Sequence, residues 1–343
     1  RTMRKPLAVL SLLAASTIAL AGCGTTSVAA PTGSAAPAAS AECAKDTTRT
    51  ATGPVSVTDA LGRTVKLDKP AERVAVLEWQ QVEDALTLCV TPVAVADAAG
   101  YRQWDRAETL PEGVADVGTR QEPNLDALFQ TKPDLVIVEA QTRDDAIIGQ
   151  LEKYGVPVLV TIGADAKDPV KQLLATFDLI AQATGRTERA EAVATEMKDH
   201  LAEAKKALAA ASPASTDFVY FDGWVDGGTV SLRPFGTGSL IGAIGGELGL
   251  TNVWKGETDP AYGLGSTDIE GMTTVGSATL LYTGTDDPDS ESFIKAAEKN
   301  PAWASIPAVK EKRIHAFPAG IWTFGGPRSA EKIADAYVDA FTR

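Results

Sequence analysis

Short apolar segments alternate with helix-like segments over most of this chain, and this alternation restricts the fold more than any other feature. The apolar segments of the first half are RVAVL (73–77), PVAVAD (92–97), DLVIVE (134–139) and VPVLVTI (156–162), and the helical patterns between them include QQVEDALTL, NLDALFQT and DDAIIGQLEKYG. Strands that alternate with helices form mostly parallel sheets covered by helices. We therefore predict an α/β lobe that begins with a β-hairpin at VSVTDALGRTVKL.

A long helical stretch follows this lobe. It runs from Asp168 to Ala211 and is interrupted at Gly185. Its second part, residues 187–211, is about 25 residues or roughly 37 Å long at 1.5 Å per residue. This is longer than a connection within one domain requires, so we predict a helix that links two lobes.

A second α/β pattern begins after Ser212-Pro213. It contains FVYFDGW, TVSLRPF, GSLIGAIGGELG, ATLLYTG and RIHAFPAG, and it closes with a helix from Arg328. The predicted fold class is therefore α/β, with two Rossmann-like lobes (55–186 and 212–343) that have central sheets and are joined by the linking helix 187–211.

The N-terminal segment is typical of a lipoprotein signal. Arg1, Arg4 and Lys5 precede the apolar run LAVLSLLAASTIAL, which ends at Leu20-Ala21-Gly22-Cys23. A membrane helix needs about 20 apolar residues, so this shorter run indicates a signal h-region. The cysteine at the cleavage position resembles the bacterial lipobox, and the alternative is an ordinary signal peptide with a chance cysteine.

On the lipobox interpretation, we expect residues 1–22 to be a removed signal peptide and Cys23 to be acylated, so that the protein is extracytoplasmic and lipid-anchored to the outer face of the cell membrane. Residues 23–54 are rich in Ala, Ser, Thr, Gly and Pro. Such a composition cannot offset its ordering entropy by burial, so we expect a flexible tether.

The two remaining cysteines, Cys43 and Cys89, leave two alternatives open. Thiols outside the cytoplasm tend to pair, so they can form a disulfide, or they can remain unpaired with Cys89 packed as a small core residue. The formal net charge of −13 disfavours nucleic acid as a partner, because lysine and arginine provide that attraction.

Motifs for catalysis and for metal binding are missing from the sequence. The two histidines, His200 and His315, lie far apart, and no G-x-S-x-G elbow occurs. The segment FGTGSLIG departs from a dinucleotide fingerprint at Ile241. We therefore predict no enzyme activity, no cofactor and no metal ion held directly by side chains.

Aromatic and arginine side chains follow the predicted strands instead. Trp79, Trp224 and Trp322 each stand just past a strand, as do Arg120 and Arg143. Ligands of open α/β sheets bind at the carboxyl ends of strands, so an aromatic crevice with arginines is predicted, suited to a large ligand with flat organic surface and anionic oxygens. For any single tryptophan, packing at the edge of the core is an equally good interpretation.

The two lobes also share a pattern. NLDALFQTKPDLVIV (124–138) aligns without a gap on DIEGMTTVGSATLLY (268–282), which places Asp126 and Glu270 in register, each in the first turn of its helix. An acid is stabilised there by the helix dipole, which is a sufficient structural reason. The functional interpretation is one exposed acid on each lobe, available to a partner that contacts both.

Four stretches resemble the ferric-siderophore substrate-binding proteins of ABC importers, and the resemblance covers about residues 55–343. They are RVAVLEWQQVEDALTLCVTPVAVADAAGYRQW, VGTRQEPNLDALFQTKPDLVIV, NVWKGETDPAYGLGST and IWTFGGPRSA. The resemblance implies two α/β lobes, a rigid linking helix and a shallow cleft. It also implies a monomer that binds a ferric siderophore without contacting the iron and delivers it to an ABC permease dimer with its ATPase.

Site residues follow from the matched positions. Arg120 matches the arginine that contacts iron-bound hydroxamate oxygens, Phe324 stands where hydroxamate binders have tyrosine, and Asp126 and Glu270 resemble the lobe-tip acids that dock into the permease. Tyr262 is a candidate substitute for a tryptophan that is Leu264 here. With the strand-end residues, the candidate ligand-binding set is Trp79, Trp104, Arg120, Arg143, Trp224, Arg233, Trp254, Tyr262, Trp322 and Phe324.

The resemblance favours a hydroxamate siderophore. The extra arginine at 143 leaves room for an anionic citrate-type chelate, and heme or a corrinoid are further alternatives on the same scaffold. The sequence leaves open which of Arg102, Arg143 and Arg233 face the cleft. A surface enzyme is an alternative from another functional class. An enzyme would be expected to have a polar cluster at the strand ends, and the sequence has aromatic residues there instead.

Overall fold

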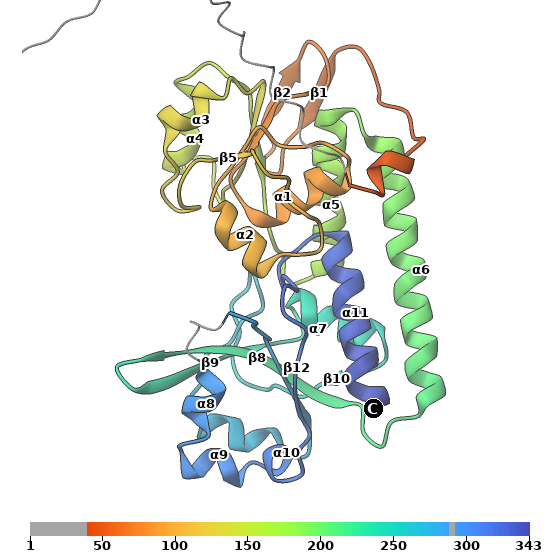
Figure 1. The fold of residues 1–343 in the computed structure, drawn as a ribbon, viewed down its shortest axis with the longest axis vertical. Coiled ribbons are helices and arrows are strands. Elements are labelled where there is room, and N and C mark those ends of the chain that lie inside the picture. The colour runs from red at the N-terminus through yellow and green to blue at the C-terminus, as the bar shows by residue number, and fades with distance from the viewer. Residues whose placement is uncertain (1–39, 288–291) are drawn as a thin grey trace, which may run out of the picture. The chain divides into compact units, whose positions relative to one another are not determined.

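The structure is a computed structural model that describes residues 40–287 and 292–343 (Figure 1). These residues belong to one compact unit. The predicted signal peptide 1–22, the acylated Cys23 and most of the predicted tether 23–54 lie outside the described residues. In the described ranges, no helix combines the length and the hydrophobicity that a membrane span requires.

The first lobe is a five-stranded parallel sheet with the strand order β5-β4-β3-β6-β7. Its strands are β3 (Val74–Val76), β4 (Ala94–Val95), β5 (Ala115–Asp116), β6 (Leu135–Glu139) and β7 (Val158–Thr161). Every residue of β3 is buried and so are the first four of β6, which explains why both are continuous apolar runs in the sequence. The hairpin β1 (Val55–Thr58) and β2 (Thr64–Leu67) precedes the sheet, as predicted.

Four short helices connect these strands: α1 (Trp79–Thr87), α2 (Ala98–Trp104), α3 (Leu125–Gln130) and α4 (Ala146–Glu152). Each begins at an acidic or amide side chain that accepts a backbone N–H of the first turn. The α1 helix starts two residues after β3, so its first residues lie at the carboxyl edge of the sheet.

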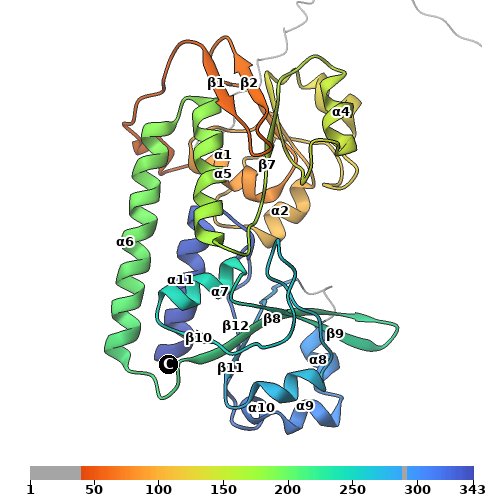
Figure 2. The ribbon, with the colours of Figure 1, turned by 180° about the vertical axis from the view of Figure 1, so that it is seen from behind.

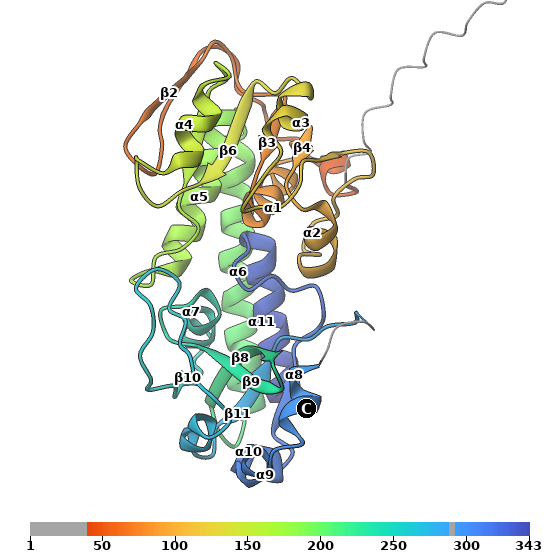
Figure 3. The ribbon, with the colours of Figure 1, turned by 90° about the vertical axis from the view of Figure 1, so that its left-hand side faces the viewer.

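The long helical stretch is two helices, α5 (Pro169–Thr184) and α6 (Thr187–Ala211). Gly185, at φ 71°, ends α5 in the left-handed conformation that glycine adopts without strain. The predicted and observed bounds of the 25-residue α6 agree. Figures 1 and 2 show α6 beside α5 and beside the C-terminal helix α11 (Pro327–Thr342), and in Figure 3 it runs behind both lobes.

The second lobe is a mixed sheet with the strand order β10-β8-β11-β12, in which β9 pairs with β8. Its strands are β8 (Asp217–Asp226), β9 (Thr229–Phe235), β10 (Thr251–Asn252), β11 (Thr279–Tyr282) and β12 (Ile314–Ala316). The β8–β9 pair is antiparallel and projects from the lobe as a hairpin (Figure 1). Gly227 and Gly228 form its turn with φ of 53° and 84°, a conformation that glycine supplies at little cost.

Short helices cover this second sheet. They are α7 (Leu240–Glu247), α8 (Phe293–Ala297), α9 (Pro301–Ser305), α10 (Pro307–Lys310) and the 3₁₀-helix η2 (Gly271–Val275). The alternation of strands and helices therefore holds in both lobes, and the predicted α/β fold class is confirmed.

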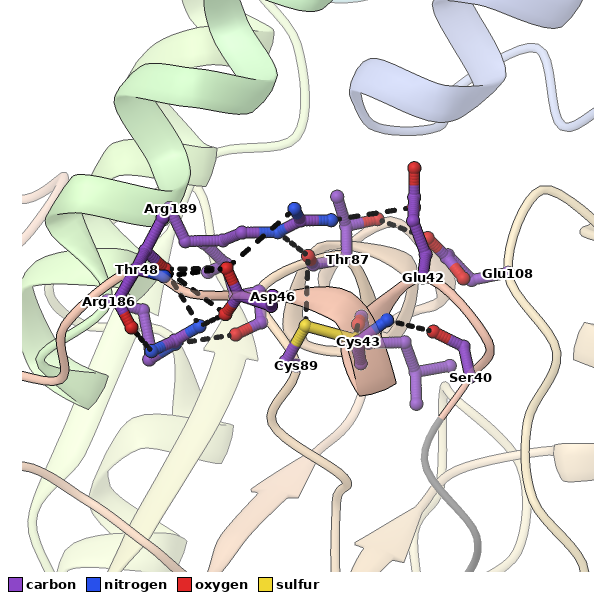
Figure 4. The surroundings of a disulfide bond; sticks show 12 residues. Ser40, Glu42, Cys43, Asp46, Thr48, Thr87, Cys89, Glu108, Arg186 and Arg189 are labelled. Atoms are coloured by element: carbon purple, nitrogen blue, oxygen red, sulfur yellow. Dashed lines mark hydrogen bonds and ion pairs between the residues drawn. A yellow bond between two sulfur atoms is a disulfide. The ribbon is translucent and has the colours of Figure 1, made fainter.

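Cys43 and Cys89 form a disulfide, so the paired alternative holds (Figure 4). Cys43 opens the 3₁₀-helix η1 (Cys43–Lys45), and the bond joins it to Cys89, two residues past the end of α1. Arg186, between α5 and α6, forms an ion pair with Asp46 and donates to the Leu88 carbonyl at 2.9 Å. The described N-terminal segment is thereby attached to the first lobe by a covalent bond and an ion pair.

Candidate functional site

A cleft with a cavity volume of about 640 Å³ lies between the lobes, and we call it the main compartment. Its first-lobe walls include Trp79, Trp104 and Arg120. The second-lobe walls include Asp222, Arg233, Tyr282, Phe317, Trp322 and Phe324. A smaller space of about 330 Å³, the side compartment, shares Arg120, Arg233, Trp322 and Phe324 with it and is also lined by Glu78, Gln80, Glu139, Gly163, Tyr262 and Leu264.

The ends of parallel strands bring the first-lobe residues together. Glu78 and Trp79 follow β3 after one intervening residue, Glu139 is the last residue of β6, and Arg120 lies in the loop after β5. The carboxyl ends of parallel strands meet at one edge of a sheet, which is where ligands of such sheets bind.

Arg120 connects several walls of the cleft. Its guanidinium carbon lies 3.9 Å from the ring centroid of Trp79 and 5.7 Å from that of Trp322. Its NH1 donates to Glu78 Oε1 at 2.6 Å. Trp79 and Trp322 meet edge to face at 4.8 Å, so a cation, an acid and two rings from both lobes form one packed group.

Trp79 is already engaged on its other side. It is 4% exposed, and its indole N–H donates to the carbonyl of Asp97 at 3.2 Å. Trp79 is therefore a rigid wall of the compartment, and the partly buried Trp104 and Trp322 offer more of their surface to a ligand.

Arg233 is the second arginine of the cleft. It stands opposite Asp222 across the β8–β9 hairpin, and its Nε donates to Asp222 Oδ1 at 2.9 Å while NH2 contacts Oδ2. Its guanidinium also lies 5.7 Å from the Phe235 ring and 5.8 Å from the Phe324 ring. Burial raises the pKa of Asp222, and Arg233 opposes that rise.

Tyr262 bridges the lobes on the side-compartment wall. Its hydroxyl donates to Glu139 Oε1, and its ring meets Phe324 edge to face at 5.5 Å. Burial raises the pKa of Glu139 above its ordinary value, and the Tyr262 hydrogen bond opposes that rise. Burial, with the nearby Glu139 charge, also raises the pKa of Tyr262, so this hydroxyl remains a donor at neutral pH.

Seven of the ten predicted ligand-binding residues line the two compartments: Trp79, Trp104, Arg120, Arg233, Tyr262, Trp322 and Phe324. Their placement fits the prediction that strand ends form an aromatic crevice with arginines. Their binding role stays a prediction.

Arg143, Trp224 and Trp254 line neither compartment, so the structure does not bring them into this crevice, and their binding role stays a prediction. Arg143 Nε donates to the Leu61 carbonyl in the β1–β2 turn at 2.7 Å, which draws the side chain away. Trp224 is 48% exposed on the projecting β8–β9 hairpin. Trp254 packs against the second-lobe core and lies over Gly256.

Arg102 also lines neither compartment, because it donates to the Pro111 carbonyl at 3.1 Å. Of the three arginines that the sequence left open, Arg233 therefore faces the cleft.

Sequence reasoning missed the acids that line the two compartments, Glu78, Glu139, Asp222 and Asp287, and the amide of Gln80. For Glu78, Glu139 and Asp222 the available signal was position, because each stands at the end of, or next to, a predicted strand that also supplies a predicted residue. Glu78 directly precedes Trp79, and Asp222 lies two residues before Trp224. The predicted charge of the crevice was too positive because these acids were not counted.

The two lobe-tip acids are exposed, and each accepts a hydrogen bond from a neighbouring side chain. Asp126 lies in the first turn of α3, as predicted, and accepts from the Tyr154 hydroxyl at 3.1 Å. Glu270 differs from the prediction: it caps the 3₁₀-helix η2 instead of lying within its first turn, and it accepts from Asn300 Nδ2 at 3.3 Å.

Over residues 40–287 and 292–343, no group of three His, Cys, Asp or Glu side chains could hold a metal ion. The polar side chains described above are arginines paired with carboxylates, and a tyrosine hydroxyl. Such groups can form hydrogen bonds with an organic ligand.

The sequence matches a family of binding proteins and individual binding proteins. A model of the family described as periplasmic binding protein matches residues 74–319. The putative ABC transporter substrate-binding lipoprotein YhfQ of Bacillus subtilis is 30% identical over 281 residues, which cover 78% of this chain and 82% of that protein. The iron(3+)-hydroxamate-binding protein FhuD of Escherichia coli is 27% identical over 263 residues, which cover 75% of this chain and 83% of that protein.

Among solved structures, the siderophore-binding protein FhuD from Vibrio cholerae with bound Fe³⁺–Desferal superposes with a TM-score of 0.64 at 22% sequence identity. The match covers 79% of this chain and 98% of that chain. At this level of identity, the likeness supports the two-lobed fold.

Proposed function

The chain belongs to the periplasmic binding protein family, and we propose that it binds a ferric siderophore between its lobes and delivers it to an ABC import permease. It is a substrate-binding protein and not an enzyme. The proposal rests on one observation: Arg120 and aromatic rings from both lobes line the main compartment, which is a partly open cavity.

The size and walls of the main compartment suit a chelate that is recognised through its organic shell. A cavity of about 640 Å³ lies within the range of small-molecule sites. Trp104, Trp322 and Phe324 offer apolar surface, and Arg120 and Arg233 offer N–H donors to ligand oxygens around the iron. The partly open form also suits a protein that must release its ligand.

The charge balance favours a hydroxamate-type chelate over an anionic one. The basic side chains that the structure places along the two compartments are Arg120, Arg233 and Lys295, and the acidic ones are Glu78, Glu139, Asp222 and Asp287. A ferric trihydroxamate core is neutral and needs no surplus of cations. A citrate-type chelate is anionic, and the argument for it from Arg143 is lost because that arginine lies outside the cleft.

We further propose that the protein acts as a monomer, anchored at the outer face of the cell membrane through Cys23, and that Asp126 and Glu270 dock onto a permease dimer with its ATPase. Relatives named as ABC transporter lipoproteins support the anchor and the importer. The exposure of one acid on each lobe supports the docking, because a partner that contacts both lobes can reach both.

Fluorescence titration tests this function. Trp79, Trp104 and Trp322 line the main compartment, so a ferric trihydroxamate should quench tryptophan emission in the purified protein. Trp322→Phe should reduce the quenching, and Trp224→Phe, on the hairpin outside both compartments, is the matched control. Quenching by heme with no response to ferric trihydroxamates would contradict the proposal.

A further inference from the structure

The side compartment differs chemically from the main one. Beyond the residues that both share, four of its six lining residues carry polar side chains: Glu78, Gln80, Glu139 and Tyr262. Its volume of about 330 Å³ is half that of the main compartment, and it adjoins the main compartment along Arg120 and Arg233. A ligand in the main compartment can therefore extend one arm past the arginines into the side compartment.

Glu139 is the acid of the side compartment that forms no ion pair of its own, although the nearby Arg120 charge opposes the rise of its pKa. The two arginines that line this space are each engaged by another carboxylate, Arg120 by Glu78 and Arg233 by Asp222. No ion pair joins Glu139 to a basic residue in the part of the chain that the structure describes. A partly buried carboxylate that forms no ion pair is stabilised when a further cation approaches it.

The position of the Glu139 carboxylate is well defined. Oε1 accepts the Tyr262 hydroxyl, and Oε2 lies against Gly163, where an added Cβ would sit 2.4 Å from it. Only a residue without a side chain fits at 163 while Glu139 keeps this position. Burial raises the pKa of Glu139, so an approaching cation would also favour its ionised form.

Gln80 gives an independent indication of a polar occupant. The residue is 3% exposed and lines the side compartment, yet its amide nitrogen has no hydrogen-bond partner among the described residues. A buried donor without an acceptor is destabilising. The nitrogen is closed off from the compartment in this side-chain position, so a ligand oxygen would supply the acceptor once the Gln80 side chain turns toward it.

We propose that the side compartment is a subsite for a chelate arm that ends in an ammonium group and contains an amide carbonyl. The ammonium donates to Glu139, the carbonyl accepts from Gln80 once that side chain has turned, and the ferric core stays in the main compartment. An arm that ends in a carboxylate is disfavoured there, because it would meet Glu78 and Glu139. This subsite rests on the proposed function, since the arm belongs to a chelate bound in the cleft.

Two ferric trihydroxamates that differ only at the arm test the subsite. One is linear ferrioxamine with a free terminal amine, and the other is the same chelate with that amine acetylated, so the ferric core is unchanged. Calorimetric titration of the wild-type protein should give at least tenfold tighter binding of the amine form, or about 1.4 kcal/mol. Glu139→Gln should remove the difference by weakening the amine form alone. Glu203→Gln, on the exposed face of α6, is the control.

Equal affinity of the wild-type protein for the two chelates would overturn the subsite and leave the proposed function standing. Tighter binding of the amine form that persists in Glu139→Gln would overturn the assignment to Glu139. If neither chelate binds, the proposed function fails and the subsite with it. The wild-type comparison needs no variant, so it decides the question even if Glu139→Gln does not fold.

Discussion

Removal of the Cys43–Cys89 disulfide should destabilise the protein by about 4 kcal/mol. The bond links residues 46 positions apart. Closing a loop of that length in the unfolded chain lowers its entropy by about 13 cal/mol/K in the chain-entropy model, which is about 4 kcal/mol at 25 °C. The folded state should change little, because Asp46 remains paired with Arg186 and Arg189 still donates to the Thr87 carbonyl (Figure 4).

Urea denaturation measures this loss. The oxidised protein is compared with the double variant Cys43→Ser/Cys89→Ser, in which no unpaired thiol is left at either position. The free energy of unfolding should fall by about 4 kcal/mol, and the denaturant dependence should rise because the unfolded chain becomes less compact. Ligand affinity should not change, since neither cysteine lines the cleft.

Reduced wild-type protein serves as the control and should unfold like the double variant. A loss below about 1 kcal/mol would refute the reasoning that the bond acts on the unfolded chain. A loss of the near-ultraviolet circular dichroism in the double variant without urea would also refute it, because the native packing would then depend on the bond.

Three further predictions concern the cleft, the lobe tips and a buried acid. Arg120→Ala should weaken binding of the preferred ferric chelate at least tenfold, about 1.4 kcal/mol, in calorimetric titrations, and an unchanged affinity would remove Arg120 from the site. Asp126→Arg with Glu270→Arg should leave binding intact and abolish uptake by cells; continued uptake would be evidence against docking through these acids. Burial raises the pKa of Glu108 from 4.5 to about 7, so the folded state holds a proton that the unfolded chain releases, and the free energy of unfolding should fall as pH rises through this range. Glu108→Gln should reduce this pH dependence in urea titrations, and an identical slope in the variant would contradict the assignment.

The parts of the fold with strong periodicity were predictable. Strands β3 and β6 are buried on both faces, so they are uninterrupted apolar runs in the sequence. Helix α6 buries one stripe of apolar residues at helical spacing and is bounded by turn-forming residues, so its bounds were predicted as observed.

Strand pairing was less predictable. The runs FVYFDGW and TVSLRPF were read as strands of an alternating α/β pattern, but they pair antiparallel as β8 and β9. An apolar run shows that a segment is a strand and does not show which strand lies beside it. The Asp-Gly-Gly turn between the runs is the signal that favours a hairpin.

The sequence positions of the site residues were predictable, but the directions of their side chains were less predictable. Strand ends placed Arg120 and Arg143 alike, yet Arg120 turns to Glu78 and the Trp79 ring whereas Arg143 turns to the Leu61 carbonyl, 82 residues earlier in the chain. The partner of a long side chain depends on contacts between distant segments. The charge of the cleft could not be predicted for the same reason.

Equilibrium affinity measures whether the cleft prefers a ferric chelate of the hydroxamate type. The purified protein is titrated with a ferric trihydroxamate and with ferric dicitrate under the same conditions. The trihydroxamate should bind at least tenfold more tightly, because the cleft has no surplus of positive charge. Tighter binding of ferric dicitrate would contradict the hydroxamate assignment, and the absence of binding to any ferric chelate would contradict the proposed function itself.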